Sequence, residues 1–211
     1  DEFEDVFQAT SDWWHTWVSR IRYKGRWREM VTRSALVMKM MISADFGAMV
    51  AAPTFGLPEQ PGGERNWDYR YCWIRDTSFA MYAFVRLGLV EEVESFVDWI
   101  DARVCESSRT SGSDPLRIMY TLDGGTELTE RTLDNFAGWK DSRPVRIGNG
   151  AADQFQLDIY GELMDAIYLA NKYGRSSSYE NWEDVCRIIT WLSGNWRRPD
   201  QGIWEGRGAG K

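Results

Sequence analysis

Apolar side chains recur at helical spacing along most of this chain, and that periodicity constrains its fold more than any other feature. In the clearest case, residues 90–105, the glutamates fall on one face and the apolar residues on the other: Val93, Phe96, Val97, Ile100 and Val104. Helices are also predicted over 11–21, 25–43, 77–88, 152–174 and 178–196, with a short one near 127–139. Because consecutive helices are joined by loops, the pattern predicts an all-α fold of stacked helical hairpins.

Residues that favour helix ends support several of these boundaries. Ser11 and Thr77 are good N-caps, because a hydroxyl accepts a hydrogen bond from a backbone N–H of the first turn. Gly88 is expected to end the helix that starts at Thr77, since glycine adopts the left-handed conformation without steric cost. Gly161 lies in the middle of helix 152–174, and we expect another helix to pack tightly against it.

Strand signals are confined to short pieces, of which residues 66–74 are the most distinct. Trp67, Tyr69, Tyr71 and Trp73 occupy alternate positions there, so an extended backbone would place all four rings on one face. One interpretation is a strand whose rings pack in the core. The other is a wall for a ligand with apolar faces and polar edges, such as a sugar ring.

The length of 211 residues suits one domain or part of a larger one. We expect residues 1–10 to be an N-terminal linker and residues 11–211 to form the domain. No apolar run reaches the roughly 18 residues that a membrane helix needs, so no membrane partner is expected. The N-terminal residues also lack the basic and then apolar layout of a secretory signal.

Charge and cysteine content narrow the functional classes. A formal net charge of -7 argues against a nucleic-acid partner, and a single histidine, His15, argues against a histidine-rich metal site. We therefore expect a neutral ligand, no metal and no cofactor. Cys72, Cys105 and Cys186 lie far apart without CxxC spacing, which favours reduced thiols and a cytoplasmic location, with secretion left open.

Arg75 and Asp76 directly follow the aromatic segment, at the mouth of a predicted helix. An adjacent cation and anion provide donors and acceptors suited to neighbouring hydroxyl groups. Glu205 follows Trp204 in a glycine-rich loop, and a carboxyl group beside a tryptophan can be kept protonated, as a general acid requires. A solvated loop glutamate is the alternative for Glu205.

A third polar segment surrounds Gly148, Asn149 and Gly150, where small residues let the backbone approach a ligand closely. Just after it, Gln154, Asp158 and Asp165 follow one another at near-helical spacing along one side. A solvated helix face is the alternative explanation for these three residues.

Three motifs, in this order, resemble the glucoamylase and trehalase family of glycoside hydrolases, family 15. They read LPEQPGGERNWDYRYCWIRDTSF, SRPVRIGNGAADQFQLDIYGE and PDQGIWE, and the resemblance covers about residues 11–208. It implies an (α/α)6 barrel of inner and outer helices, of which this chain would hold about the first half. It also implies an inverting hydrolase that acts on the non-reducing ends of α-glucosides, of the glucoamylase or the trehalase type.

The resemblance also assigns roles to residues of the motifs. Glu205 corresponds to the general acid of the family, and Arg75 and Asp76 to the pair that holds hydroxyls of the terminal glucose. Tyr69 and Trp73 match aromatic residues that line the same subsite.

Other positions match the family more loosely. Trp204 corresponds to the residue beside the acid, and Arg146 and Asn149 fall in a matching loop near the site. Trp67 and Tyr71 are left as packing residues.

The catalytic base of the family is a glutamate in the second half of the barrel, which this chain does not include. We therefore expect another segment or chain to complete the barrel and to cover apolar faces that would otherwise be exposed. Gly206 also departs from the family pattern, since many relatives have valine there.

Three alternatives remain on the sequence alone. An α-glucoside phosphorylase on a similar barrel would use phosphate as nucleophile and would not need the missing glutamate. A non-catalytic carbohydrate-binding protein would keep the aromatic residues and the Arg75–Asp76 pair. An all-α interaction domain would use the aromatic residues as core and would bind no saccharide.

Overall fold

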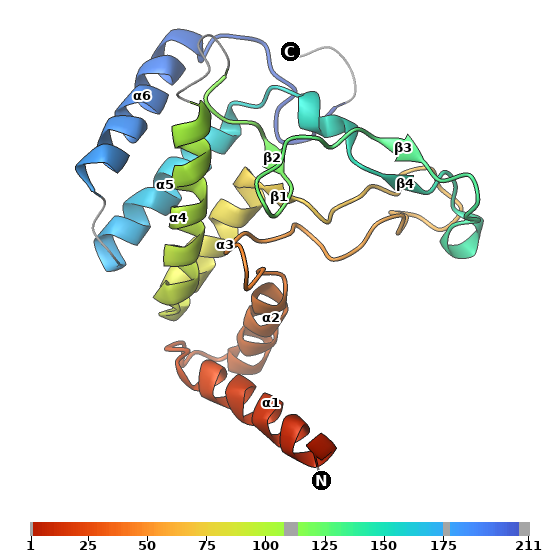
Figure 1. Ribbon diagram of the computed structural model, residues 1–211, viewed down its shortest axis with the longest axis vertical. Helices are drawn as coiled ribbons and strands as arrows, with labels where there is room; N and C mark the ends of the chain where they lie inside the picture. The colour runs from red at the N-terminus through yellow and green to blue at the C-terminus, as the bar shows by residue number, and fades with distance from the viewer. Residues whose placement is uncertain (1, 108–113, 175–177, 207–211) are drawn as a thin grey trace.

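The computed structural model describes residues 2–107, 114–174 and 178–206 of the chain (Figure 1). About half of this part is helical, in the helices that the periodicity predicts. The helices are α1 (Glu2–Ser19), α2 (Arg28–Met40), α3 (Ile74–Leu87), α4 (Val90–Ser107), α5 (Asp158–Tyr173) and α6 (Tyr179–Asn195). The short strands are β1 (Cys72–Trp73), β2 (Met119–Tyr120), β3 (Arg131–Thr132) and β4 (Arg146–Ile147), and the 3-10 turns are η1 (Trp139–Asp141) and η2 (Gly150–Asp153).

Helices α3 to α6 form one packed group, in which α3 lies along α5 and α4 contacts both (Figure 1). The side chains between them are almost fully buried, among them Met81, Phe84, Phe96, Ile100, Ile159 and Leu163. The inward face predicted for α4 is confirmed, because Val93, Phe96, Ile100 and Val104 are buried and Val97 is half-buried against the core. Burial of these apolar faces, at about 25 cal/mol per Å², is what stabilises the group.

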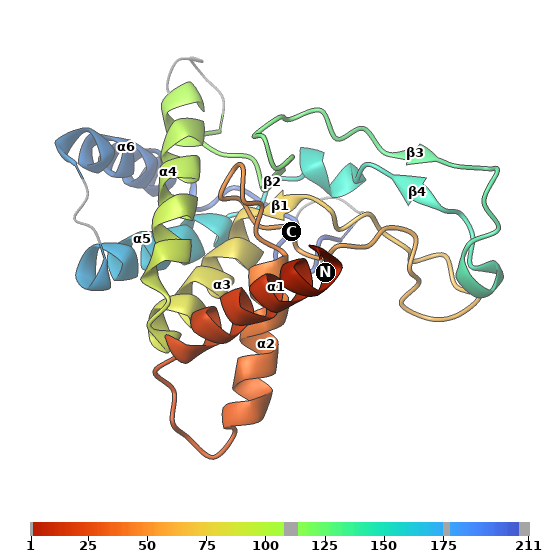
Figure 2. The same ribbon diagram turned by 60° about the horizontal axis from the view of Figure 1, so that its bottom comes forward.

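Helices α1 and α2 lie at one end of the molecule, and the β3–β4 segment extends to one side in both views (Figures 1 and 2). Each of the two small sheets is an antiparallel pair: β1 with β2, and β3 with β4. The backbone N–H of Ile74 donates to the carbonyl of Ile118, so the β1–β2 pair fixes the point where α3 begins. Among the described residues, every helix is too short or too polar to cross a bilayer.

The aromatic segment is extended as predicted, but only Cys72 and Trp73 of it form a strand. The preceding residues are held by backbone hydrogen bonds to the 51–54 loop. Ala52 N–H donates to the carbonyl of Tyr69 over 3.0 Å, and Ala51 N–H to that of Tyr71 over 2.9 Å.

Some predicted helix starts were wrong. Helix α1 begins at Glu2, so residues 2–10 are helical where a linker was expected; Glu2, Glu4 and Asp5 complement the positive helix N-terminus. Helix α3 begins at Ile74, which places Thr77 inside its first turn instead of at the cap. The Thr77 hydroxyl instead lies 3.3 Å from the Cys72 thiol, in the core.

The two glycine predictions have opposite outcomes. Gly88 ends α3 with a φ of 84°, in the left-handed conformation, as predicted. The close packing expected at Gly161 is not found, because a Cβ added there would meet no described atom within 4 Å.

The helix predicted near 127–139 is absent. Strand β3 lies there instead, and the Leu133 N–H donates to the Val145 carbonyl across the β3–β4 pair.

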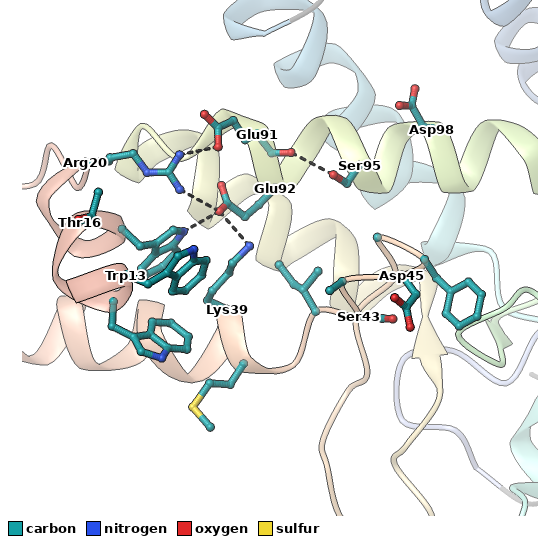
Figure 3. Close-up of a pocket in the computed structure, with 17 residues that line it drawn as sticks. Trp13, Thr16, Arg20, Lys39, Ser43, Asp45, Glu91, Glu92, Ser95 and Asp98 are labelled. Atoms are coloured by element: carbon teal, nitrogen blue, oxygen red, sulfur yellow. Dashed lines mark hydrogen bonds and ion pairs between the residues drawn. The ribbon is translucent and has the colours of Figure 1, made fainter. Parts of the chain in front are cut away.

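A buried carboxylate, Glu92, ties α1, α2 and α4 together (Figure 3). Its Oε1 accepts a 2.6 Å hydrogen bond from the Trp17 indole N–H and lies 3.2 Å from Lys39 Nζ and 3.5 Å from Arg20 Nη2. The expectation that all glutamates of α4 face solvent is therefore wrong for Glu92. A buried carboxylate is tolerated here because two cations and an N–H compensate its charge.

Candidate active site

A cavity of about 640 Å³ opens where α3 begins, and its walls come from segments far apart in the sequence. The extended aromatic segment forms one wall, the loop from β4 into η2 a second, and the residues around 203–206 a third. Every residue that the family resemblance places at the site lines this cavity: Tyr69, Trp73, Arg75, Asp76, Arg146, Asn149, Trp204 and Glu205.

Arg75, in the first turn of α3, is the centre of the polar network. Its Nη2 lies 3.0 Å from Glu205 Oε1 and 3.4 Å from Asp76 Oδ2. Its Nη1 donates to Gln156 Oε1 over 2.9 Å and to Asp158 Oδ2 over 3.2 Å. Burial lowers the pKa of Arg75, but the negative charge of Asp76 and the bonds to Glu205 and Asp158 outweigh it, so the net shift is upward.

Glu205 is held by two donors that end on the same oxygen. The Trp73 indole N–H donates to Glu205 Oε1 over 2.8 Å, beside the Arg75 contact. The backbone of Glu205 adopts a φ of 49°, a conformation that side chains other than glycine seldom take. Its carbonyl accepts a 3.2 Å bond from Gln154 Nε2, which ties the loop to the residues before α5.

Asp76 is crowded by other acids. Burial raises the pKa of its carboxyl group, Arg75 lowers it, and the nearby charges of Glu205 and Asp158 raise it again, for a net upward shift. The carboxylates of Asp76, Asp158 and Glu205 all contact the Arg75 guanidinium. Because Arg75 and Asp76 both line the cavity, a donor and an acceptor lie side by side in its wall.

The aromatic wall is built from Tyr69 and Trp73, whose ring centroids lie 6.0 Å apart. Burial, followed by the charge of Glu59, raises the pKa of the Tyr69 hydroxyl above its ordinary value. Trp67 was expected only to pack, yet it also lines the cavity, beneath the Arg146 guanidinium at 4.8 Å. The Tyr71 hydroxyl instead bonds to the Gly148 N–H, outside this wall.

Arg146 and Asn149 serve the framework of the loop. Arg146 Nη1 donates to the Glu64 carbonyl over 2.9 Å and to Asn66 Oδ1 over 2.8 Å. Asn149 is buried, and its side chain bonds to the Asp68 carbonyl and caps η2 through the Ala151 N–H.

Trp204 differs from the other aromatic residues of the site, because it is 91% exposed. It lies at the rim of the cavity, next to Glu205.

Two residues were under-rated by the sequence reasoning. Asp158 was noted only for its spacing, with a solvated face as the alternative, and Gln156 was not singled out. Both contact Arg75, and Gln156 is 1% exposed. A buried glutamine is uncommon, but its burial is set by the fold and leaves no mark in the local sequence. Asp165, the third residue of that series, is exposed.

The chain is similar to glycosyl hydrolases along most of its length. The family model "Glycosyl hydrolases family 15" matches residues 25–211. A trehalase of Thermoplasma acidophilum is 42% identical over 201 residues, covering 95% of this chain and 33% of that protein. A trehalase of Mycobacterium tuberculosis is 40% identical over 209 residues, covering 99% of this chain and 30% of that protein. The chain thus spans about a third of the length of these curated relatives.

The chain is also similar to two more distant proteins. An isomaltose glucohydrolase of Kribbella flavida is 29% identical over 165 residues, covering 75% of this chain and 37% of that protein. A glycosidase variant solved in complex with glucose superposes with a TM-score of 0.55 at 23% identity, covering 85% of this chain and 43% of that one. The predicted fold class, a partial (α/α) barrel, is confirmed by this likeness. By the family match, the chain belongs to glycosyl hydrolases family 15.

Proposed function

We propose that this chain forms the acid-bearing half of an inverting glycoside hydrolase that cleaves α-glucosides from the non-reducing end. The observation that carries the proposal is the convergence of Glu205, Arg75 and Asp76 in one aromatic-walled cavity. Trehalose is the substrate we rank first, since trehalases are the relatives matched at about 40% identity. Release of glucose from maltose or isomaltose is the second specificity within the same reaction class.

In this proposal the cavity binds the terminal glucose. Arg75 and Asp76 exchange hydrogen bonds with its hydroxyl groups, since they present donors and acceptors side by side. Tyr69 and Trp73 supply the apolar wall for the sugar faces. Arg146 and Asn149 hold the loop that frames the site.

Glu205 is the proposed general acid. The bonds from Trp73 and Arg75 both end on Oε1, which leaves Oε2 as the oxygen that would deliver a proton. In the reaction this proton passes to the glycosidic oxygen while the bond from that oxygen to C1 breaks. Trp204, next to the acid in the sequence, also lines the cavity.

Inversion needs a second carboxylate, about 6.5–9.5 Å from the acid, to take a proton from the attacking water. We propose that the remainder of the barrel, on another segment or chain, supplies this base. Water then attacks C1 from the face opposite the leaving group, and the released glucose has the opposite anomeric configuration. This chain and that remainder together make up the complete enzyme.

The experiment is a sugar panel followed by proton NMR. The complete enzyme is incubated with trehalose, maltose and isomaltose, with and without phosphate, and the first-formed anomers are recorded before mutarotation. We expect hydrolysis without phosphate, and β-glucose as the first product from the cleaved non-reducing residue. Turnover that requires phosphate would identify a phosphorylase instead, and binding without turnover would identify a carbohydrate-binding protein.

A further inference from the structure

The side of Arg75 that faces away from Glu205 is held by two residues that lie just before and at the start of α5. Gln156 Oε1 accepts a 2.9 Å bond from Arg75 Nη1, and Asp158 Oδ2 accepts a 3.2 Å bond from the same nitrogen. The Arg75 side chain is 11% exposed. The guanidinium therefore lies between Glu205 on one side and Gln156 and Asp158, at the start of α5, on the other.

Among the described residues, the Asp158 side chain bonds only to Arg75. Its second oxygen, Oδ1, is buried and has no hydrogen-bond partner among the described residues. An aspartate at the start of a helix can accept a hydrogen bond from a backbone N–H of the first turn, but the N-cap position of α5 is Leu157 and this helix has no side-chain cap bond. The bonds of the Asp158 side chain thus lead to Arg75.

Gln156 links the two sides of the network. Its Nε2 donates to Gln154 Oε1 over 3.0 Å, and Gln154 Nε2 in turn donates to the carbonyl of Glu205 over 3.2 Å. The residues just before and at the start of α5 thereby contact both Arg75 and the backbone of Glu205. Fixing a long, flexible arginine in one rotamer in this way lowers the entropic cost of binding a substrate.

We propose that Asp158 and Gln156 are positioning residues that fix the Arg75 guanidinium against Glu205 and the terminal sugar. The pair acts through Arg75 and does not touch the reacting atoms. This inference rests on the proposed function for its catalytic consequence, but the positioning itself is measurable without turnover.

The test compares Asp158→Asn and Gln156→Leu with wild type in the complete enzyme. Nitrogen-15 NMR of the Arg75 guanidinium, assigned by its loss in Arg75→Lys, reports hindered rotation of the Nη groups. We expect slow rotation in wild type and faster rotation in both variants. Trehalose kinetics should show kcat/KM reduced about tenfold, with kcat lowered and KM raised, because a charged hydrogen bond is lost.

Asp153→Asn is the matched control, since this aspartate belongs to the same segment but pairs with Arg117 and is 90% exposed. It should leave the Arg75 signals and the kinetics unchanged. Arg75 signals that stay unchanged in Asp158→Asn and Gln156→Leu would overturn the positioning role. Altered signals in an enzyme that cleaves no α-glucoside would instead uphold the positioning and contradict the proposed function.

Discussion

The indole nitrogen of Trp73 lies 2.8 Å from Oε1 of Glu205, although 132 positions separate the two residues. Replacing Trp73 with Phe removes this donor while keeping an aromatic wall. Because the lost bond is made to a charged or reacting carboxyl group, we expect kcat to fall about tenfold with KM changed less. Steady-state trehalose kinetics of the complete enzyme measure this. Trp99→Phe serves as control, since its indole bonds to the Leu122 carbonyl away from the cavity.

Asp76 should limit stability at neutral pH. Its pKa is raised in the folded chain, so the folded state holds this proton more tightly than the unfolded state does. The resulting penalty is absent below the unfolded pKa of 3.8 and grows as pH rises through the folded pKa. Asp76→Asn should therefore be at least as stable as wild type at pH 7 while binding glucose far more weakly.

Urea unfolding at pH 3 and pH 7 checks the stability part, and glucose titration checks the binding part. If Asp76→Asn were less stable than wild type at pH 7 but equally stable at pH 3, the upward direction of the Asp76 pKa shift would be contradicted. Because the Asp76 side chain is 45% exposed, solvent screening keeps the effect small.

Glu92 should be a major stabilising residue of the α1–α2–α4 junction. Glu92→Gln keeps the shape but leaves Lys39 and Arg20 without their buried counter-charge, so we expect a loss of about 2 kcal/mol in unfolding free energy. Glu91→Gln is the control, because Glu91 pairs with Arg20 at an exposed position and should change stability by less than about 0.5 kcal/mol. Equal losses in urea titrations of the two variants would refute the role of Glu92.

Gly88 and Gly161 should respond oppositely to alanine. At Gly88 the φ of 84°, and the 2.7 Å that would separate an added Cβ from Arg22 Cδ, predict a loss of about 1–2 kcal/mol for Gly88→Ala. At Gly161 an added Cβ meets open space inside a helix, so Gly161→Ala should gain about 0.5–1 kcal/mol. Thermal melts of both variants test the pair, and a loss at Gly161 would show that another segment packs there.

Cysteine reactivity should separate Cys72 from Cys105. Burial raises the pKa of the Cys72 thiol to about 11, whereas Cys105 is exposed. Iodoacetamide at pH 8 should label Cys105 within minutes and Cys72 only after unfolding, as peptide mass spectrometry would show. Rapid labelling of folded Cys72 would contradict its place in the core.

Local sequence patterns predicted the parts of this fold that depend on neighbouring residues. The inward face of α4 and the left-handed end of α3 at Gly88 follow from periodicity and from the φ that glycine allows. The start of α3 at Ile74 does not, because it is fixed by pairing of β1 with β2, which lies more than forty positions away. Long-range pairing also replaced the helix predicted near 127–139 with β3.

The site shows the same division. Glu205, Arg75 and Asp76 were predicted from motifs, and all three line one cavity. The motifs did not reveal that Gln156 and Asp158 contact Arg75, because those contacts arise only when the start of α5 meets the start of α3.

The most direct test of the account is the Glu205→Gln variant of the complete enzyme. It keeps the Trp73 and Arg75 contacts available but has no proton to give to the leaving oxygen. We measure trehalose turnover by glucose release and glucose affinity by calorimetry, with Glu183→Gln on the exposed face of α6 as control. The account predicts that Glu205→Gln loses hydrolysis by at least about 1,000-fold while glucose affinity stays near that of wild type. Turnover equal to that of wild type would contradict the assignment of Glu205 as the general acid.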